Sequence, residues 1–391
     1  MWHLAWRHVV YYRGQTLLLV AAIALAGYLP IATELLLRRL QHDLRSRADA
    51  TPLVVGKLGS RTDLMLHALY FTAKAPGRIP FGTMETVTAD GYARAIPLAA
   101  VHTAKRVSLV GTSLDYFEYR RLRVSSGRTF GRLGECVVGA SVARRLGLSP
   151  GDSLLTDTES FVELTRYPLK LHVVGVLAAA GTPDDDAVFC DIKTVWVIEG
   201  IGHGHQDLGG VDEPGVVLER TENAVTAGAA LKQYLEITPE NEASFHFHGN
   251  MRDFPITAVI LIPRDEKSET ILLGRWHESD EFQVIEPDRV VELLLGTVFQ
   301  IKHLLDLAAV FVAVSTGLLI ALVVLLSLRL RAAEMATLFK LGCRRATTAR
   351  LISAELLIVT GLSCAVLVVM LGTTWLVGPS LLRWWIVSGG V

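Results

Sequence analysis

The chain has 391 residues, a formal net charge of -1 and a hydrophobic fraction of 51%. This near-neutral balance, without a basic tail or an aromatic-basic stripe, argues against a nucleic-acid partner. The four cysteines show no CxxC spacing and no metal-site pattern; Cys136 and Cys190 either form one disulfide or, as we expect, stay unpaired and buried.

Three apolar runs are each long enough to cross a membrane. Residues 17–37 are apolar except for Glu34, residues 304–328 are apolar except for Asp306, and residues 356–377 carry no charge. About 20 helical residues cross about 30 Å of hydrocarbon, and in lipid such a run must satisfy its own backbone hydrogen bonds. The runs therefore predict three transmembrane helices rather than buried helices of a soluble protein.

The first run could also be read as a signal peptide, because two arginines precede it and Ala24-Leu25-Ala26 is typical of a cleavage site. Apolar residues continue beyond that tripeptide as far as Leu37, which favours an uncleaved anchor. Residues 1–13 are amphipathic and are expected to lie in the membrane interface before the first span.

The residues between the first and second spans predict a mixed α/β domain, formed by one domain or by two lobes. Short apolar or alternating runs predict strands, and an apolar pattern with helical spacing predicts helices. The expected strands are residues 52–56, 106–110, 136–139, 169–176 and 256–262, and the expected helices are residues 62–71 and 140–146.

Two groups of residues in this domain invite a metal hypothesis. Asp184-Asp185-Asp186 lacks the remaining spacing of a calcium loop, so we expect a solvated turn there. The pairs His203-Gly204-His205 and His246-Phe247-His248 are different, because residues i and i+2 of a strand point the same way. Each pair could chelate one ion, and the four imidazoles could bind zinc if they converge. The alternative is that they are polar loop residues.

The orientation follows from the basic residues of the short loop at residues 329–350. It contains six arginines and lysines but a single acid, Glu334, and loops with that excess of basic residues stay cytoplasmic. The large domain is therefore expected outside the cytoplasm. Four arginines after the first span disagree with this rule, although the rule weakens for long domains; they are Arg38, Arg39, Arg45 and Arg47.

The expected organisation has seven segments. These are an interfacial segment (1–13), the first span (14–37), the extracytoplasmic α/β domain (38–302), the second span (303–328), a cytoplasmic segment (329–350), the third span (351–378) and a short tail (379–391).

Several motifs, in this order, resemble one family. Arg331, Glu334, Leu338 and Gly342 follow the R-x-x-E-x-x-x-L-x-x-L-G pattern found after the second membrane helix of the MacB/FtsX-like permeases, the type VII ABC transporter superfamily. Residues 137–152 are similar to a strand–helix–turn of that superfamily's periplasmic core domain. Residues 173–176, followed by Gly181-Thr182-Pro183 and Asp186, are similar to another part of it.

The resemblance implies a permease subunit in the inner (plasma) membrane, with a fold like the MacB periplasmic core domain. It also implies a homodimer, embedded in membrane lipid, that works with a separate ABC ATPase. No segment matches G-x-x-x-x-G-K-[ST], so the chain is not expected to be an enzyme or to bind a cofactor directly, zinc excepted. The residues expected to contact the ATPase, unless the loop instead lies on anionic lipid, are Arg331, Glu334, Met335, Leu338, Phe339 and Gly342.

Two other functions fit the same sequence. One is an FtsX-like signalling module that activates an extracytoplasmic partner and transports nothing. The other is a membrane-anchored metal-binding protein that uses the histidine pairs. Family members usually have a fourth span, whereas residues 379–391 are too few to cross a membrane, so we expect an altered transport geometry. The cargo and its direction of movement stay open.

Overall fold

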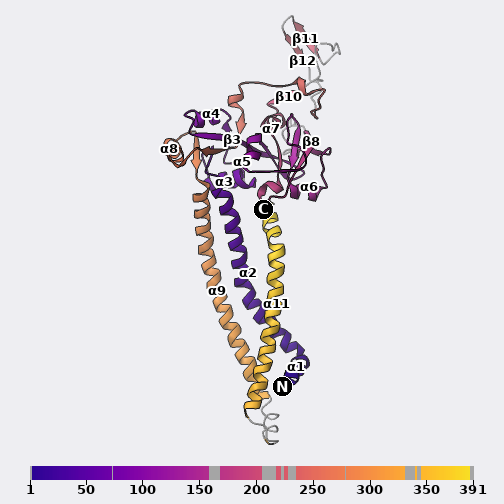
Figure 1. The fold of residues 1–391 in the computed structure, drawn as a ribbon, viewed down its shortest axis with the longest axis vertical. Helices are drawn as coiled ribbons and strands as arrows, with labels where there is room; N and C mark the ends of the chain where they lie inside the picture. Colours follow the sequence, from indigo (N-terminus) through magenta and orange to yellow (C-terminus); the bar gives the residue numbers. More distant parts are fainter. Residues whose placement is uncertain are drawn as a thin grey trace. The chain divides into compact units, whose positions relative to one another are not determined.

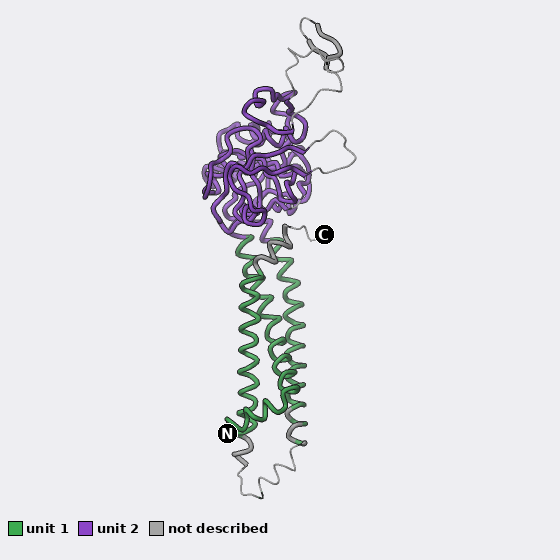
Figure 2. The backbone as a smooth tube through the Cα atoms, turned by 90° about the vertical axis from the view of Figure 1, so that its right-hand side faces the viewer, with its two compact units in different colours: residues 1–44, 293–390 green, residues 45–292, 391 purple. Residues whose placement is uncertain are grey.

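The computed structural model describes residues 2–72, 74–157, 168–204, 217–221, 224–227, 235–277, 279–330, 340 and 345–387. The chain divides into two compact units, coloured in Figure 2. Unit 1 consists of residues 1–44 and 293–390 and is helical in its described part. Unit 2 consists mainly of residues 45–292 and mixes helices with strands.

Four long or amphipathic helices make up the described part of unit 1. Three of them contain stretches long and apolar enough to cross a membrane: Arg13–Asp49, Pro287–Val323 and Arg350–Gly378. The three predicted apolar helices are thus confirmed as helices of spanning length and composition. The helices, labelled in Figure 1, are α1 (Trp2–Tyr11), α2 (Arg13–Asp49), α9 (Pro287–Leu330) and α11 (Arg345–Val387).

Polar side chains join the helices of unit 1. The Lys302 ammonium, on α9, lies 3.2 Å from Glu34 of α2 and 2.6 Å from Asp306 of its own helix. The Tyr28 hydroxyl of α2 lies 2.8 Å from the Thr374 hydroxyl of α11. A charged or polar group within an apolar helix needs a partner, and these groups find theirs on the same helix or on another helix of unit 1.

Unit 2 is built on a ten-stranded mixed sheet with the order β16-β1-β15-β3-β4-β9-β6-β8-β5, in which β7 also pairs with β8. The β4–β9 and β6–β8 pairs are parallel, and the other pairs are antiparallel. The strands are β1 (Leu53–Lys57), β3 (Ala93–Ala104), β4 (Val107–Thr112), β5 (Val124–Gly127), β6 (Glu135–Val138), β7 (Ser153–Leu155), β8 (Lys170–Leu177), β9 (Val188–Asp191), β15 (Ala258–Pro263) and β16 (Phe282–Ile285).

Short helices pack on this sheet, and three two-stranded ribbons complete unit 2. Apolar side chains of the sheet and of several of these elements form one core, in which Trp196 is fully buried. The helices are α3 (Arg61–Tyr70), α4 (Thr83–Thr88), α5 (Leu114–Tyr119), α6 (Ala140–Leu146), α7 (Ile192–Ile198), α8 (Glu266–Trp276) and the 3-10 turns η1 (Pro183–Asp186), η3 (Glu242–Ser244) and η4 (Met251–Asp253). The ribbons pair β10 (Gly202–Gly204) with β13 (Phe245–Phe247), β11 (Val217–Thr221) with β12 (Ala224–Ala227), and β2 (Ile79–Pro80) with β14 (Pro255–Ile256).

The predicted α/β character is confirmed, and each predicted strand and helix of this domain has a counterpart. The last predicted strand is split, because Thr257 separates β14 from β15 and donates its side-chain hydroxyl to the Leu98 carbonyl at 3.0 Å. Cys136 and Cys190 stand opposite each other on β6 and β9 as buried free thiols, as expected. Burial raises the pKa of Cys136 to about 12, so this thiol stays protonated and unreactive at neutral pH.

Candidate functional site

Three of the four predicted histidines lie in one cluster on unit 2. His203 of β10 is paired directly with His246 of β13, and His248 follows two residues later. The ring centroids are 4.8 Å apart for His203–His246, 4.9 Å for His203–His248 and 4.8 Å for His246–His248. One nitrogen from each ring lies within 4.8 Å of the others. The fourth predicted ligand, His205, lies outside the described residues.

The alternation of residue types along the two strands explains the cluster. Gly202 pairs with Phe247 and Gly204 with Phe245, so each phenylalanine lies across from a glycine. A Cβ atom on either glycine would lie 2.5 Å from a ring carbon of that phenylalanine. The two glycines therefore make room for the rings. Because side chains alternate along a strand, the histidines gather on the opposite face.

The phenylalanine face fastens this ribbon to the core of unit 2. Phe247 packs edge-on against Trp196, with centroids 6.3 Å apart, and against Phe254 at 6.1 Å. The Trp196 indole nitrogen in turn donates to the Pro255 carbonyl at 2.9 Å. Buried aromatic pairs of this kind hold a strand in place, so the imidazoles are presented on an ordered support.

The orientation of one imidazole is set by the backbone. Nδ1 of His246 lies 3.0 Å from the Ser244 carbonyl oxygen, which can only accept, so Nδ1 carries the proton and Nε2 the lone pair. Metal-bound histidines usually have such a second partner. Imidazole suits zinc, copper, nickel and iron, so the cluster has the chemistry of a transition-metal site.

A second polar site lies at the end of α2, in the part of that helix that belongs to unit 2. The Arg47 guanidinium donates to both carboxylate oxygens of Asp184, at 2.7 and 2.8 Å. Arg47 is 6% exposed and Asp184 0% exposed, so the pair is enclosed in the core. The guanidinium also donates to the Tyr116 hydroxyl at 2.8 Å, and this hydroxyl donates to Asp184 at 2.6 Å. The last turn of α2 is thereby joined to α5 and η1.

The backbone that leaves α2 is also held by α5. Arg120 donates to the Ala50 carbonyl at 3.2 Å and to the Thr51 hydroxyl at 2.8 Å. The Tyr119 hydroxyl donates to the same Ala50 carbonyl at 2.5 Å. A cation at a helix C-terminus stabilises the free carbonyls there, so α2 ends in a closed polar cap.

The expectation of a solvated turn at residues 184–186 is wrong, because Asp184 and Asp185 are 0% and 3% exposed. The two carboxylates serve as structural acceptors: Asp185 accepts from the backbone N–H groups of Ala180 and Gly181 at 3.0 and 2.8 Å. Arg47 is one of the arginines that disagreed with the orientation rule. That disagreement was a signal in the sequence that Arg47 is paired, since an arginine neutralised in a buried pair no longer acts as a free positive charge.

This pair predicts acid sensitivity. Burial alone would raise the pKa of Asp184, but the Arg47 charge and the hydrogen bonds from Arg47 and Tyr116 outweigh it and hold the pKa below its ordinary value of 3.8. A lowered pKa contributes stability that is present above that value and is lost as pH falls through the folded-state pKa. The thermal midpoint of the full chain in detergent should therefore drop as the pH falls below about 4 and passes through the lowered pKa of Asp184. It should drop less in a chain carrying Arg47→Met with Asp184→Leu; an equal drop would contradict the assignment.

The residues expected to contact an ATPase cannot be placed. Arg331, Glu334, Met335, Leu338, Phe339 and Gly342 all lie outside the described residues. Their role stays a prediction.

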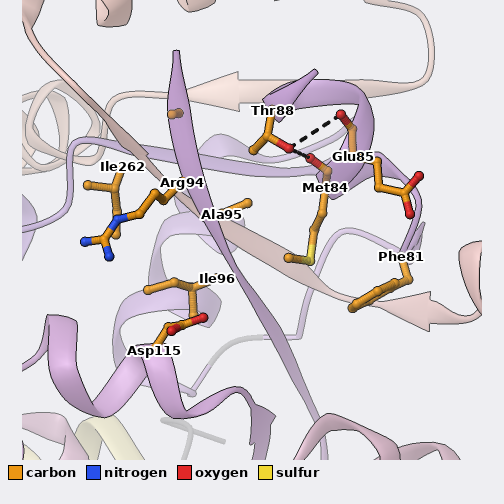
Figure 3. A pocket seen from close by; sticks show the side chains of 10 residues that line it. Phe81, Met84, Glu85, Thr88, Arg94, Ala95, Ile96, Asp115 and Ile262 are labelled. Atoms are coloured by element: carbon orange, nitrogen blue, oxygen red, sulfur yellow. Dashed lines mark hydrogen bonds between the residues drawn. The ribbon is translucent and has the colours of Figure 1, made fainter. Parts of the chain in front are cut away.

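Unit 2 also has a surface pocket of about 370 Å³, shown in Figure 3. Its carboxylates already have partners: Glu85 lies 2.7 Å from Arg252, and Asp115 accepts from Ser113 at 3.3 Å. The lining residues are Phe81, Met84, Glu85, Thr88, Ala93, Arg94, Ala95, Ile96, Asp115 and Ile262.

Comparison with known proteins finds one family model that matches most of unit 2. Residues 55–234 match the model of the MacB-like periplasmic core domain. No curated protein matched the chain.

Two solved structures have similar chains. The periplasmic region of MacB from Actinobacillus actinomycetemcomitans is 11% identical, with a TM-score of 0.36, over 64% of this chain and 97% of that one. The extracellular domain of the noncanonic ABC-type transporter YknZ from Gram-positive bacteria is 12% identical, with a TM-score of 0.33, over 60% and 98%.

The family match and the helices of unit 1 support a membrane protein with an extracytoplasmic domain. The match covers the strand–helix–turn that suggested the family from sequence. Residues 55–234 therefore carry a MacB-like periplasmic core domain, as the resemblance found in the sequence predicted.

Proposed function

We propose that this chain is the permease-type, non-ATPase subunit of an ABC transporter and converts ATP hydrolysis by a partner subunit into motion of unit 2. The MacB-like periplasmic core domain and the three helices of spanning length support this role. The sequence has no P-loop, so a separate subunit would bind the nucleotide phosphates. We further propose that two copies of the chain work with two ATPase subunits in the membrane.

The observation that carries the proposal is the buried attachment of α2 to unit 2. α2 is one helix from Arg13 to Asp49, and its last turn is held by the Arg47–Asp184 pair. A hydrogen-bonded helix has a fixed rise of about 1.5 Å per residue, so it transmits an axial shift rather than absorbing it. Pulling Arg47 away from Asp184 would leave two buried charges without partners, which is costly. Motion of α2 should therefore carry η1 and α5 with it.

The segment that follows α2 and the segment that precedes α9 form neighbouring strands in unit 2. β1 begins at Leu53, shortly after α2 ends, and β16 ends at Ile285, shortly before α9 begins at Pro287. These two strands are hydrogen-bonded neighbours, with Val54 opposite Ile285. α2 and α9 are thus connected in the chain to adjacent strands of one sheet. This connection supports the proposal that relative motion of the two helices reaches unit 2.

The ATPase contact is tested by changing its proposed apolar face. Met335, Leu338 and Phe339 have the i, i+3, i+4 spacing of one helix face in the sequence. Each buried side chain of this kind would contribute about 1.5–3 kcal/mol to association before ordering costs. Leu338→Asp should therefore reduce recovery of the ATPase with the tagged chain by at least about tenfold. Glu334→Lys should reduce it as well. The measurement is quantitative co-purification from membranes in which both subunits are expressed.

Lys340→Ala is the matched control, because it changes the same segment outside that apolar face. Recovery of the ATPase with this variant should equal that with the unchanged chain. Unchanged recovery with Leu338→Asp would refute the coupling assignment. If the ATPase binds but its ATP cycle leaves hydrogen exchange in unit 2 unaltered, the proposed conversion into motion is wrong.

A further inference from the structure

The geometry points to a transition-metal site on unit 2, in which the imidazoles of His203, His246 and His248 bind one divalent ion, zinc in particular. The site is separate from the ATPase contact and does not depend on it. Two ligands come from paired strands, and the third follows the end of β13. The sequence suggested two chelating pairs, whereas the structure joins members of both pairs in one cluster.

The distances suit one ion between the rings. Zinc–nitrogen bonds of about 2.0–2.1 Å in a tetrahedral site require ligand nitrogens about 3.3 Å apart. The three nitrogens here lie within 4.8 Å of one another, so modest ring rotations close the remaining gap. His248 is exposed and can turn without disturbing the core, while His203 and His246 are half-buried.

The support of the cluster fits a ligand-binding site better than a chance surface group. Phe245 and Phe247 anchor the opposite face of the ribbon. Their rings leave no room for a side chain at the two glycine positions opposite them. The Ser244 carbonyl directs Nε2 of His246 as a ligand. Among the described residues three side chains serve as ligands, which leaves the fourth position of a tetrahedral ion for water or another ligand.

Metal binding would join two segments that are far apart in the sequence. His203 belongs to β10, which follows α7, and His246 belongs to β13, which pairs with β10. An ion bound by both side chains would cross-link the two strands. Because binding to the folded state alone stabilises it, zinc should raise the thermal midpoint of the full chain, and a chelator should reverse the change.

The test is a zinc titration of the full chain in detergent, purified through a tag that contains no histidine and stripped with a chelator. We expect one ion per chain with a dissociation constant below about 10 μM. His246→Ala and His248→Ala should each weaken binding by at least about 100-fold, since loss of outer-shell partners alone costs 10- to 100-fold. His277→Ala, which removes an exposed histidine of the same unit outside the cluster, should leave binding unchanged.

Three results would overturn the site. They are a stoichiometry far below one ion, zinc binding that persists in the doubly substituted His246→Ala/His248→Ala chain, and an equal loss of binding with His277→Ala. The unchanged chain provides a second test that does not depend on a variant folding. Cobalt should replace zinc and show the intense visible bands of a low-coordinate nitrogen site, whereas the weak spectrum of hydrated cobalt would contradict the proposal.

Discussion

Arg47→Met is expected to destabilise unit 2 by about 3–5 kcal/mol, because it leaves the Asp184 carboxylate buried without its cation. Asp184 is fully buried and accepts hydrogen bonds from Arg47, Tyr116 and Thr182. Removal of the guanidinium takes away two of these bonds and the opposite charge together. For a domain of this size the loss corresponds to a decrease of about 6–20 °C in the thermal midpoint.

The measurement is pulse proteolysis of the full chain in detergent at increasing urea, with thermal unfolding as a second readout. Arg38→Met is the matched control: the same change in the same helix removes a guanidinium that is 78% exposed, and little change in stability should result. Arg47→Met combined with Asp184→Leu removes both charges and should recover much of the loss, because buried pairs can often be replaced by apolar residues. A double variant as unstable as Arg47→Met alone would argue against the ion pair as the cause.

Gly139→Ala is expected to cost about 3 kcal/mol or more, because the space for a methyl group is occupied by backbone. A Cβ atom at Gly139 would lie 2.4 Å from the carbonyl oxygens of both Asp184 and Asp185. Backbone cannot move aside as a flexible side chain can, so η1 itself would have to shift. The Gly139 φ of -63° suits any residue, so the cost arises from contact and not from backbone strain.

Gly274→Ala is the control for this prediction. Gly274 lies within α8 with nothing within 4 Å of an added Cβ atom, and replacing a helical glycine by alanine should stabilise the protein by up to about 1 kcal/mol. The two variants should thus move the urea midpoint in opposite directions. If Gly139→Ala were neutral, the close approach of α6 and η1 would not exist as described.

The Arg47→Met/Asp184→Leu chain also separates the stability of unit 2 from the transmission of motion into unit 2. Both Arg47 and Gly139 act on η1, but only Arg47 belongs to the helix that contains the first span. If α2 transmits motion through the ion pair, the Arg47→Met/Asp184→Leu chain should retain most of its stability yet show a weakened response of unit 2 to the ATP cycle. A full response in this stable variant would assign transmission to the strands β1 and β16 alone.

Much of the fold could be predicted because its signals are local. An apolar run predicts a membrane helix without knowledge of its neighbours, and fully apolar or alternating runs predicted β1, β4, β6, β8 and β15. β3 was not predicted. Its residues, Ala93–Ala104, are rich in alanine and lack a regular alternation, and the strand is held by its pairing with β15 and β4.

The candidate sites show where local signals end. The H-x-H pairs indicated metal-binding residues, but a pair does not reveal which other pair lies beside it; the register of β10 against β13 decides that. Gly202 and Gly204, the neighbours of His203 in the sequence, make room for the phenylalanines across the ribbon. The run of aspartates was expected to be solvated, but Asp184 and Asp185 are buried, and the partner of Asp184 comes from another element.

The sequence by itself determined that this protein has three helices of spanning length around a MacB-like domain, because apolar run length and the order of short motifs are properties of the chain alone. The tertiary structure alone decided that Arg47 meets Asp184, 137 residues away, and that His203 meets His246 and His248. The physical reason is the same in both sites. A buried charge or a metal-ligand set depends on which groups share one small volume, and chain folding sets that proximity through strand register and packing rather than through neighbouring residues.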